Sequence, residues 1–497
     1  MAKPSASARE HSSSANTPLL SDQQPDQESG PGPSAATPPS VLILYFMAIH
    51  FLLAFCEIIL VAPLIKLLEN SLCLSYYSFP VNGVQDELCK IPDIQGPLAT
   101  LRGWKSSFDT IPVLLVAIPF GRLGDRYGRR KILATALVGV AASLCEIFVV
   151  CAFPKVFPVR LVWLSSILLL FGGGLNSASA YMWAMASEVI PSKQRSHGFY
   201  YIFAAYYVAE LIASFVASVT TDISPWIPCS LAMGSVILCL ILLAVMPDPR
   251  GSLHESESPE SPIAEDYTSP TITKPTATSR LLTLLSNPNI LFTIPVFLVG
   301  ILRYTTLNVL IQYANIRFHL PLSTGATFYT ETAGINILLF LFLIPALTSH
   351  IRTKYALRPQ TIDLFLVRTS VCLLSIGSLA IGLAPTKSLL PLGVAIFSTG
   401  FGSRVSALSL ISTWITPTDK ATVYASITVL ESLGHAVGDP GMQHIFAASL
   451  RLDKFWLAMP FFVAAGCYCL TTISTMFISI EKEGEGEGEG EGGMIGS

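Results

Sequence analysis

Long runs of apolar residues, separated by short polar segments, fill the chain from residue 41 to residue 480. Most runs hold about twenty residues or more, and twenty helical residues at 1.5 Å each span a hydrocarbon core of about 30 Å. The pattern therefore predicts an all-α polytopic membrane protein with twelve transmembrane helices. The expected spans are 41–67, 97–120, 132–153, 159–187, 199–219 and 226–246, followed by 289–313, 322–347, 363–384, 388–415, 421–437 and 455–480.

Polar segments divide the chain into five parts. Residues 1–40 are rich in Ser, Pro, Ala and Gln, and residues 481–497 are mostly alternating Gly and Glu. Neither composition can form a packed core, so both are expected to be disordered or solvated tails. Residues 247–288, rich in Pro, Ser and acidic side chains, are expected to be a linker. Two six-helix halves remain, residues 41–246 and 289–480.

The composition supports the membrane class and excludes others. Of 497 residues, 51% are hydrophobic and 13% are charged, whereas a soluble protein carries roughly 25% charged residues. The net charge of −3 gives no reason to expect a nucleic-acid partner. The ten cysteines show no metal-ligand spacing, and no Gly-x4-Gly-Lys nucleotide signature occurs. We therefore expect no metal, no cofactor and no ATP drive.

Basic residues predict the orientation in the membrane. Lys and Arg concentrate in the loops after even-numbered helices, above all in segment 121–131, which reads GRLGDRYGRRK. Such residues are retained in the cytoplasm, so both tails and the linker are expected there. The loop that holds Cys73 and Cys89 then faces an oxidising compartment, where a disulfide is expected and two free thiols are the alternative. The plasma membrane is preferred over the vacuolar membrane.

Charged side chains within the spans are candidates for transport. A charge at the bilayer centre costs at least roughly 2.5–3.5 kcal/mol, so it normally faces the protein interior or a water-filled cavity. Some of these residues must instead form structural ion pairs. The candidate acids are Glu57, Asp109, Glu146, Glu210, Glu331 and Glu431, with Arg303, Arg368, Arg404 and His435 as cationic partners. Tyrosines that can shape a pocket for a flat organic substrate, or simply pack, are Tyr206, Tyr207, Tyr304 and Tyr424.

The basic segment resembles a family signature. The pattern Gly-x-x-x-Asp-Arg-x-Gly-Arg-Arg-Lys marks the loop between helices 2 and 3 of the major facilitator superfamily. It is matched here by Gly121, Asp125, Arg126, Gly128, Arg129, Arg130 and Lys131. The stretch Cys73-Leu-Ser-Tyr-Tyr77 and the pair Cys89-Lys90 resemble fungal facilitators that are distantly similar to proton-coupled folate transporters.

The resemblance implies roles for several residues. Asp125 and Arg129 would make charge-relay contacts that hold one state of a transport cycle, and Gly121 and Gly128 would allow tight packing beside them. The alternative is that these cations only set the orientation. Glu57 and Glu431 are the first choices for proton coupling because helices 1 and 11 resemble cavity-lining or gating positions. For the same reason, Arg303 on helix 7 is the expected contact for an anion.

Together these observations predict a secondary active transporter of a small organic molecule, proton-coupled and working by alternating access as a monomer in the bilayer. Export of a metabolite or toxic compound is slightly preferred. Proton-coupled uptake of a folate-like or other carboxylate nutrient is the alternative. Two remote alternatives are a membrane-embedded enzyme, suggested only by His435 and Asp439 with scattered acids, and a nutrient sensor with a transporter fold.

Overall fold

The computed structural model describes residues 39–77, 86–190, 192–247, 287–355, 357–415 and 420–480. Every regular element in these ranges is a helix. The expected tails and almost all of the expected linker lie outside the described residues. The all-helical prediction is confirmed for the part of the chain that the structure describes.

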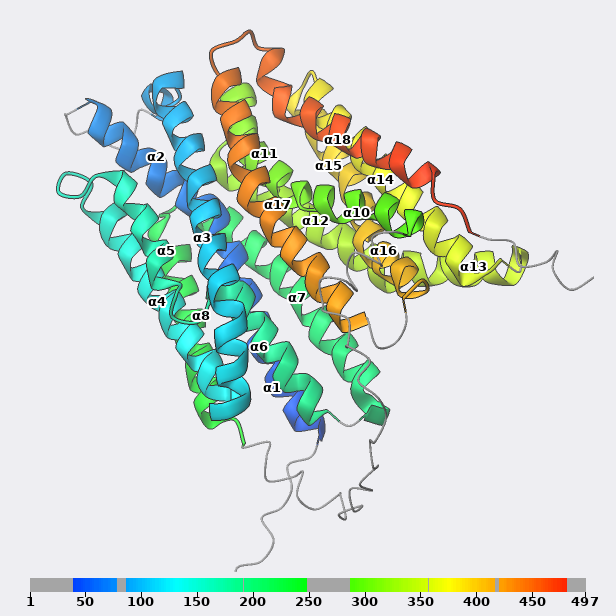
Figure 1. The fold of residues 1–497 in the computed structure, drawn as a ribbon. Helices are drawn as coiled ribbons and strands as arrows, with labels where there is room; N and C mark the ends of the chain where they lie inside the picture. The colour runs from blue at the N-terminus through cyan, green and yellow to red at the C-terminus, as the bar shows by residue number, and fades with distance from the viewer. Residues whose placement is uncertain are drawn as a thin grey trace, which may run out of the picture.

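The first group of helices forms one bundle, at the lower left of Figure 1. Its elements are α1 (Pro39–Ile59), α2 (Val61–Tyr77), η1 (Asp86–Cys89), α3 (Pro92–Tyr127), α4 (Arg129–Ala152), η2 (Val159–Leu164), α5 (Ser165–Leu168), α6 (Gly174–Val189), α7 (Ser192–Thr220) and α8 (Trp226–Val245). We call it the first group.

The second group lies at the upper right of Figure 1, and its π-helical turn η4 lies within one long helical segment. Its elements are α10 (Pro288–Gly300), α11 (Leu302–Phe318), α12 (Leu322–Leu338), η4 (Leu339–Leu343), α13 (Ile344–Tyr355), α14 (Pro359–Leu383), η5 (Lys387–Leu389), α15 (Leu390–Thr399), η6 (Gly400–Gly402), α16 (Ser403–Ser412), α17 (Lys420–Ser449), η7 (Trp456–Ala458) and α18 (Met459–Met476).

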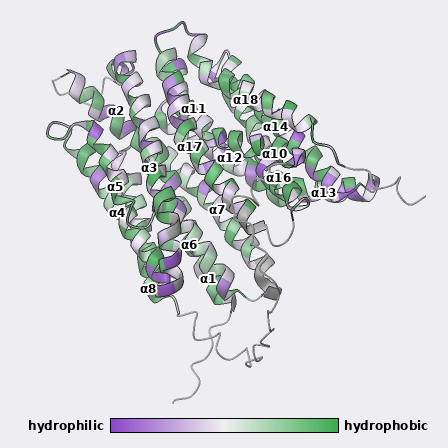
Figure 2. Ribbon diagram, viewed as in Figure 1, coloured by the Kyte–Doolittle hydropathy of each residue, from purple (hydrophilic) through white to green (hydrophobic). Residues whose placement is uncertain are grey.

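Within the described residues, nine helical segments are long and apolar enough to cross a membrane. Three more segments, α3, residues 159–189 and α17, lie where the sequence predicts the second, fourth and eleventh spans. Apolar side chains such as Val138, Ile237 and Leu470 are exposed on the bundle surface, where lipid would cover them. Hydrophobic residues cover most of the helix surfaces, and hydrophilic ones gather near helix ends such as the lower end of α3 and α13 (Figure 2).

The molecule has two ends, which we call the hairpin end and the disulfide end. The hairpin end is where α3 meets α4, and the disulfide end is where Cys73 and Cys89 are bonded. The 36-residue helix α3 runs between them (Figure 1). Along α3 and α17, the polar contacts between the two groups gather near the disulfide end, from Asp93 with Arg451 down to Ser107 with Ala436.

The basic segment is mostly helical, which differs from the loop expected from the sequence. Helix α3 continues through Tyr127, and α4 begins at Arg129, so Gly128 alone joins them. Gly128 has φ 96°, a backbone conformation that a residue with a Cβ rarely adopts. A single glycine therefore makes the turn between the two helices, where the sequence predicted a longer loop.

Helix α17 also continues past its expected end at Val437, to Ser449, with Pro440 inside it. Proline lacks an N–H, so the carbonyl four residues earlier, that of Ala436, loses its helical partner. The hydroxyl of Ser107 on α3 donates to that carbonyl at 2.6 Å. The neighbouring group thus satisfies the carbonyl, as tolerated prolines in membrane helices require.

Four expected spans are interrupted. The first breaks at Leu60, the seventh at Ile301 and the tenth at residues 400–402. The fourth breaks before α6, where Gly172, Gly173 and Gly174 all have positive φ. A Cβ on Gly172 would lie 2.5 Å from Cα of Ala136, so this glycine also permits close approach to α4, as its sequence suggested.

Candidate functional site

Two of the broken helices meet at Arg303. Breaks free backbone carbonyls, and the guanidinium of Arg303 takes up two of them: Nε donates to Gly300 O at 2.6 Å and Nη1 to Phe401 O at 2.8 Å. Its Cζ also lies 5.0 Å from the centroid of the Phe401 ring. Arg303 is 8% exposed. The N–H groups of Arg303 therefore connect the break after α10 to the break before α16.

The third break lies just after Glu57. Glu57 is exposed, although the residues on either side of it on α1, Cys56 and Ile58, are buried. Glu210 on α7 is fully buried, and neither of its carboxylate oxygens has a hydrogen-bond partner. The two carboxylates lie within electrostatic range of each other, and Glu57 lies within range of His435 in the second group. Among the described side chains, neither acid forms an ion pair.

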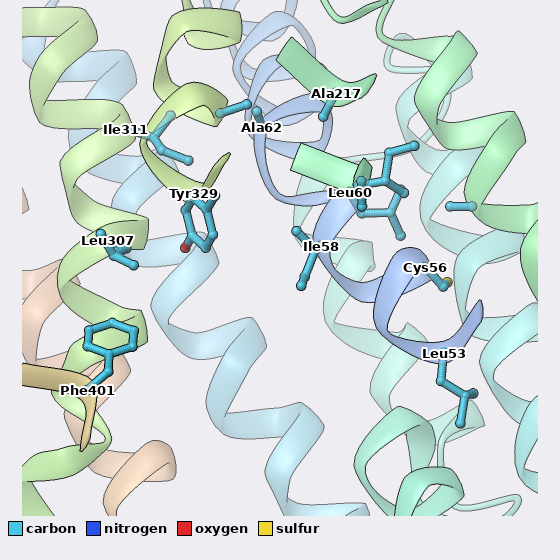
Figure 3. Close-up of a cluster of buried hydrophobic side chains, with 14 of the residues drawn as sticks. Leu53, Cys56, Ile58, Leu60, Ala62, Ala217, Leu307, Ile311, Tyr329 and Phe401 are labelled. Atoms are coloured by element: carbon cyan, nitrogen blue, oxygen red, sulfur yellow. The ribbon is translucent and has the colours of Figure 1, made fainter. Parts of the chain in front are cut away.

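These carboxylates lie beside packed apolar side chains from both groups. One buried cluster contains Cys56 and Ile58 of α1 together with Leu307 of α11 and Tyr329 of α12. Figure 3 shows the α1 stretch on one side and the α11 and α12 residues on the other. The two groups contact each other at α7 and α12, where the Thr330 hydroxyl donates to Ser214 Oγ at 2.9 Å, and apolar side chains of both groups surround the central polar residues.

Tyrosines lie next to the carboxylates. Tyr206 on α7 and Tyr304 on α11 are half-buried and lie within electrostatic range of each other and of the two carboxylates. The ring of Tyr207 stacks on that of Phe340 in η4, with centroids 5.4 Å apart. Both pairs join α7 to the second group. The fourth tyrosine singled out in the sequence, Tyr424, lines a pocket beside Arg404; whether the four shape a substrate pocket or simply pack stays a prediction.

Arg404 and Glu431 form a bidentate pair between α16 and α17. Arg404 Nε lies 2.5 Å from Glu431 Oε1, and Nη2 lies 2.8 Å from Oε2. A pocket of about 350 Å³ lies beside this pair and is lined by Leu408, Ser409, Tyr424, Ile427 and Thr428 as well as Arg404. Since each charge is paired with the other, the pair carries no net charge.

A polar network on α3, α11 and α17 joins the two groups. Asp439 on α17 accepts hydrogen bonds from Ser106 and Thr305, and its Oδ2 lies 3.8 Å from His435 Nδ1. Arg102 on α3 donates to Gln312 Oε1 at 3.1 Å and to the Asn308 carbonyl at 3.3 Å. We call this the inter-group network. The sequence analysis did not select its members except Asp439 and His435.

The network continues to the disulfide end. Gln312 donates to Gln95 Oε1 at 2.7 Å, and Gln95 donates both to the Cys89 carbonyl and to Glu69. Lys90 Nζ lies 2.6 Å from Oε1 of Glu69, which is 2% exposed. Cys73 and Cys89 form a disulfide. The described residues around Cys89 are therefore linked through Gln95 to the contact between the groups.

The signature residues serve contacts within the first group. Arg129 Nη2 lies 3.0 Å from Glu188 Oε1, and Arg130 donates to the Ala244 carbonyl at 2.6 Å. The Arg126 guanidinium lies 5.5 Å from the Tyr127 ring centroid. A Cβ on Gly121 would meet open space, so tight packing does not explain this glycine. The side chain of Asp125 lies outside the described residues.

Two further candidates belong to neither of these pairs. Asp109 pairs with Lys105 at 2.5 Å and accepts a hydrogen bond from Ser166, all within the first group. Glu331 is half-buried on α12, with no ion pair among the described residues. The structure thus brings Glu57 and Glu210 together, pairs Arg404 with Glu431, and leaves Asp109 and Glu331 outside both pairs. In the same ranges, no group of three or more His, Cys, Asp or Glu side chains is placed to hold a metal ion.

Two bundles of membrane-length helices, with discontinuous helices and lone charges where they meet, define a multi-pass membrane transporter. Residues 52–438 match the family model described as Major Facilitator Superfamily. The chain therefore belongs to the major facilitator superfamily. It is a secondary transporter with that superfamily's all-helical fold.

Curated relatives and solved structures agree with this assignment. "MFS efflux pump atnC" of Emericella nidulans is 26% identical over 470 residues, covering 90% of this chain and 92% of the relative. "Efflux pump ustT" of Aspergillus flavus is 29% identical over 411 residues, covering 79% and 80%. A crystal structure of a D-xylose–proton symporter superposes with a TM-score of 0.59 at 14% identity, covering 88% of this chain and 98% of that one.

Proposed function

We propose that the chain is a proton-driven exporter of a small organic molecule. One observation carries the proposal: Glu57 and Glu210 lie together where the two groups meet, and no described cation pairs with either. Ionisable residues inside a membrane normally mark ion and substrate pathways. Export is the direction named for the two fungal relatives described above.

Two independent features support an orientation with the hairpin end in the cytoplasm. Lys and Arg cluster at that end, and such residues are retained in the cytoplasm. The Cys73–Cys89 disulfide belongs to an oxidising compartment, and it lies at the opposite end. One orientation satisfies both features. Both termini are then cytoplasmic, and we place the protein in the plasma membrane as a monomer.

The contacts support a cycle of alternating access by the halves 41–246 and 289–480. The disulfide end is held together by the inter-group network, whereas Glu57 is exposed. We infer from these two features a state that receives substrate from the cytoplasm. Opening the disulfide end would release substrate outward and let protons reach the carboxylates. Each return carries those protons inward, and one proton crossing 100 mV supplies about 2.3 kcal/mol, enough for about 50-fold accumulation.

Uptake of a folate-like or carboxylate nutrient has weaker support. Arg303, the cation expected to contact an anion, already donates to two carbonyls of its own chain. The finer likeness to proton-coupled folate transporters stays a prediction from the sequence.

Transport into inside-out membrane vesicles tests the proposal. Vesicles that contain the transporter and have an acidic interior are incubated with a metabolite extract from a strain that lacks the transporter. The compounds that accumulate inside the vesicles are identified by mass spectrometry. We expect accumulation that collapses with the proton gradient and in Glu57→Gln and Glu210→Gln. Glu87→Gln, at an exposed position of η1 at the disulfide end, serves as the matched control. Equal accumulation with and without the gradient would refute proton drive.

A further inference from the structure

Two carboxylates at the centre of the molecule form no ion pair among the described residues. Glu57 is the exposed carboxylate there, with buried neighbours on both sides along α1. Glu210 adds a second carboxylate that is fully buried and has no hydrogen-bond partner on either oxygen. A fully buried carboxylate without a partner is costly, so such a group points to a ligand or proton that the resting contacts do not supply.

The cations around this place are already engaged. Arg303 donates to two backbone carbonyls, and Arg404 is held by both oxygens of Glu431. Arg102 donates to Gln312 and to the Asn308 carbonyl. An anionic ligand would have to break one of these sets of bonds, and His435, the cation in range of Glu57, is held 3.8 Å from Asp439, whereas Glu57 itself has no ion pair among the described residues. The balance of charge therefore favours a cation.

Aromatic rings supply the second half of a cation site. Tyr206 and Tyr304 are half-buried beside the carboxylates, and His50 lies 5.7 Å from the Tyr206 ring centroid. Ring faces attract cations, more strongly where water is excluded, and they also bind flat apolar bodies. Together the rings and Glu57 fit a ligand with a positive nitrogen attached to an aromatic or bulky apolar part.

We propose that the exported molecule is an organic cation, held by Glu57 and Glu210 and stacked on Tyr206 and Tyr304. This rests on the proposed function and names the substrate class of the same site. It also accounts for the exchange of protons against substrate, because a proton and a cation would compete for the same carboxylates.

Binding of two ions of the same shape and opposite charge tests the substrate class. The full-length protein is purified in detergent, and binding of radiolabelled tetraphenylphosphonium is measured with unlabelled tetraphenylphosphonium, tetraphenylborate or neutral triphenylphosphine oxide as competitor. We expect saturable binding and at least about a tenfold preference for the cation over the anion, as a direct charge contact provides. Tetraphenylborate competing as well as the cation, or no saturable binding, would overturn the proposal.

Variants locate the bound cation. Glu57→Gln keeps the shape and removes the charge, and we expect it to weaken binding about tenfold or more. Glu57→Asp keeps the charge and guards against a misfolded Gln variant, so it should retain most of the affinity. Glu87→Gln, at an exposed position of η1, should bind as the wild type does. Unchanged binding in Glu57→Gln would overturn the site. If the vesicles still show gradient-driven accumulation but the cation does not bind, the proposed substrate class is wrong and the proposed export stands. If the cation binds but no gradient-driven transport occurs, the proposed export is wrong.

Discussion

The close crossing of α3 and α17 offers a direct test of how the disulfide end is held shut. A Cβ on Gly103 would lie 2.8 Å from Cα of Pro440 and 3.0 Å from Cβ of Gln443. Pro440 contributes backbone atoms, which cannot swing away as a side-chain tip can. Gly103→Ala therefore wedges the two groups apart in this state.

The expected size follows from the geometry. Overpacking by a methyl group in a tight contact costs typically about 1–3 kcal/mol, which corresponds to roughly a 5- to 150-fold change in a two-state equilibrium. Because the cost falls only on the state closed at the disulfide end, the population should move toward the opposite state. Gly441→Ala is the matched control, since it lies on α17 beside Pro440 with nothing within 4 Å of its new Cβ.

Cross-linking across the disulfide end measures the closed population. Asp93 and Arg451 lie in different groups, are both exposed, and approach to 3.5 Å. Cysteines at these positions, in a background whose exposed native cysteines are changed to serine, should cross-link quickly in the parent and in Gly441→Ala. Gly103→Ala should slow the reaction at least about fivefold. Equal rates in Gly103→Ala and the parent would refute the reasoning that this crossing controls the state.

Two further substitutions test single structural features. Gly128→Ala places a Cβ at φ 96° and should cost about 1–3 kcal/mol, lowering the thermal unfolding temperature in detergent, while Gly121→Ala, in open space within helix α3, should leave it unchanged or raise it slightly. Lys90→Met leaves the buried carboxylate of Glu69 without its cation, and removing one partner of a buried pair costs about 3–5 kcal/mol. The same unfolding assay should show a large loss for Lys90→Met and a small one for Lys90→Arg; equal losses would mean that the charge is unimportant.

The pattern of apolar blocks was sufficient to predict the helices because membrane length and hydropathy are local properties. It was insufficient for their interruptions. Ile301 and residues 400–402 lie in apolar or small-residue runs that were interpreted as continuous helix, and the Arg303 guanidinium stabilises both breaks by donating to Gly300 O and Phe401 O. A tertiary contact decides these positions, so sequence periodicity cannot show them.

The site was predicted in part for the same reason. A lone charge in an apolar span is visible in the sequence, and this picked out Glu57, Glu210, Arg404 and Glu431. Which charges pair is not visible: Arg404 takes Glu431, whereas Asp109 takes Lys105 one turn away. The members of the inter-group network were missed because Arg102, Gln95 and Gln312 lie toward expected span ends, where polar residues are ordinary.

The inter-group network connects the crossing of α3 and α17 to the central carboxylates. Asp439 accepts from Ser106 in the first group but from Thr305 in its own group, and it stays beside His435. Separation of α3 from α17 would therefore remove one hydrogen bond from Asp439 and leave the others in place. His435 in turn lies within electrostatic range of Glu57. Because Glu57 and His435 belong to different groups, separation at the crossing would also change the charge surroundings of the exposed carboxylate, and we propose this as the link between gate and site in alternating access.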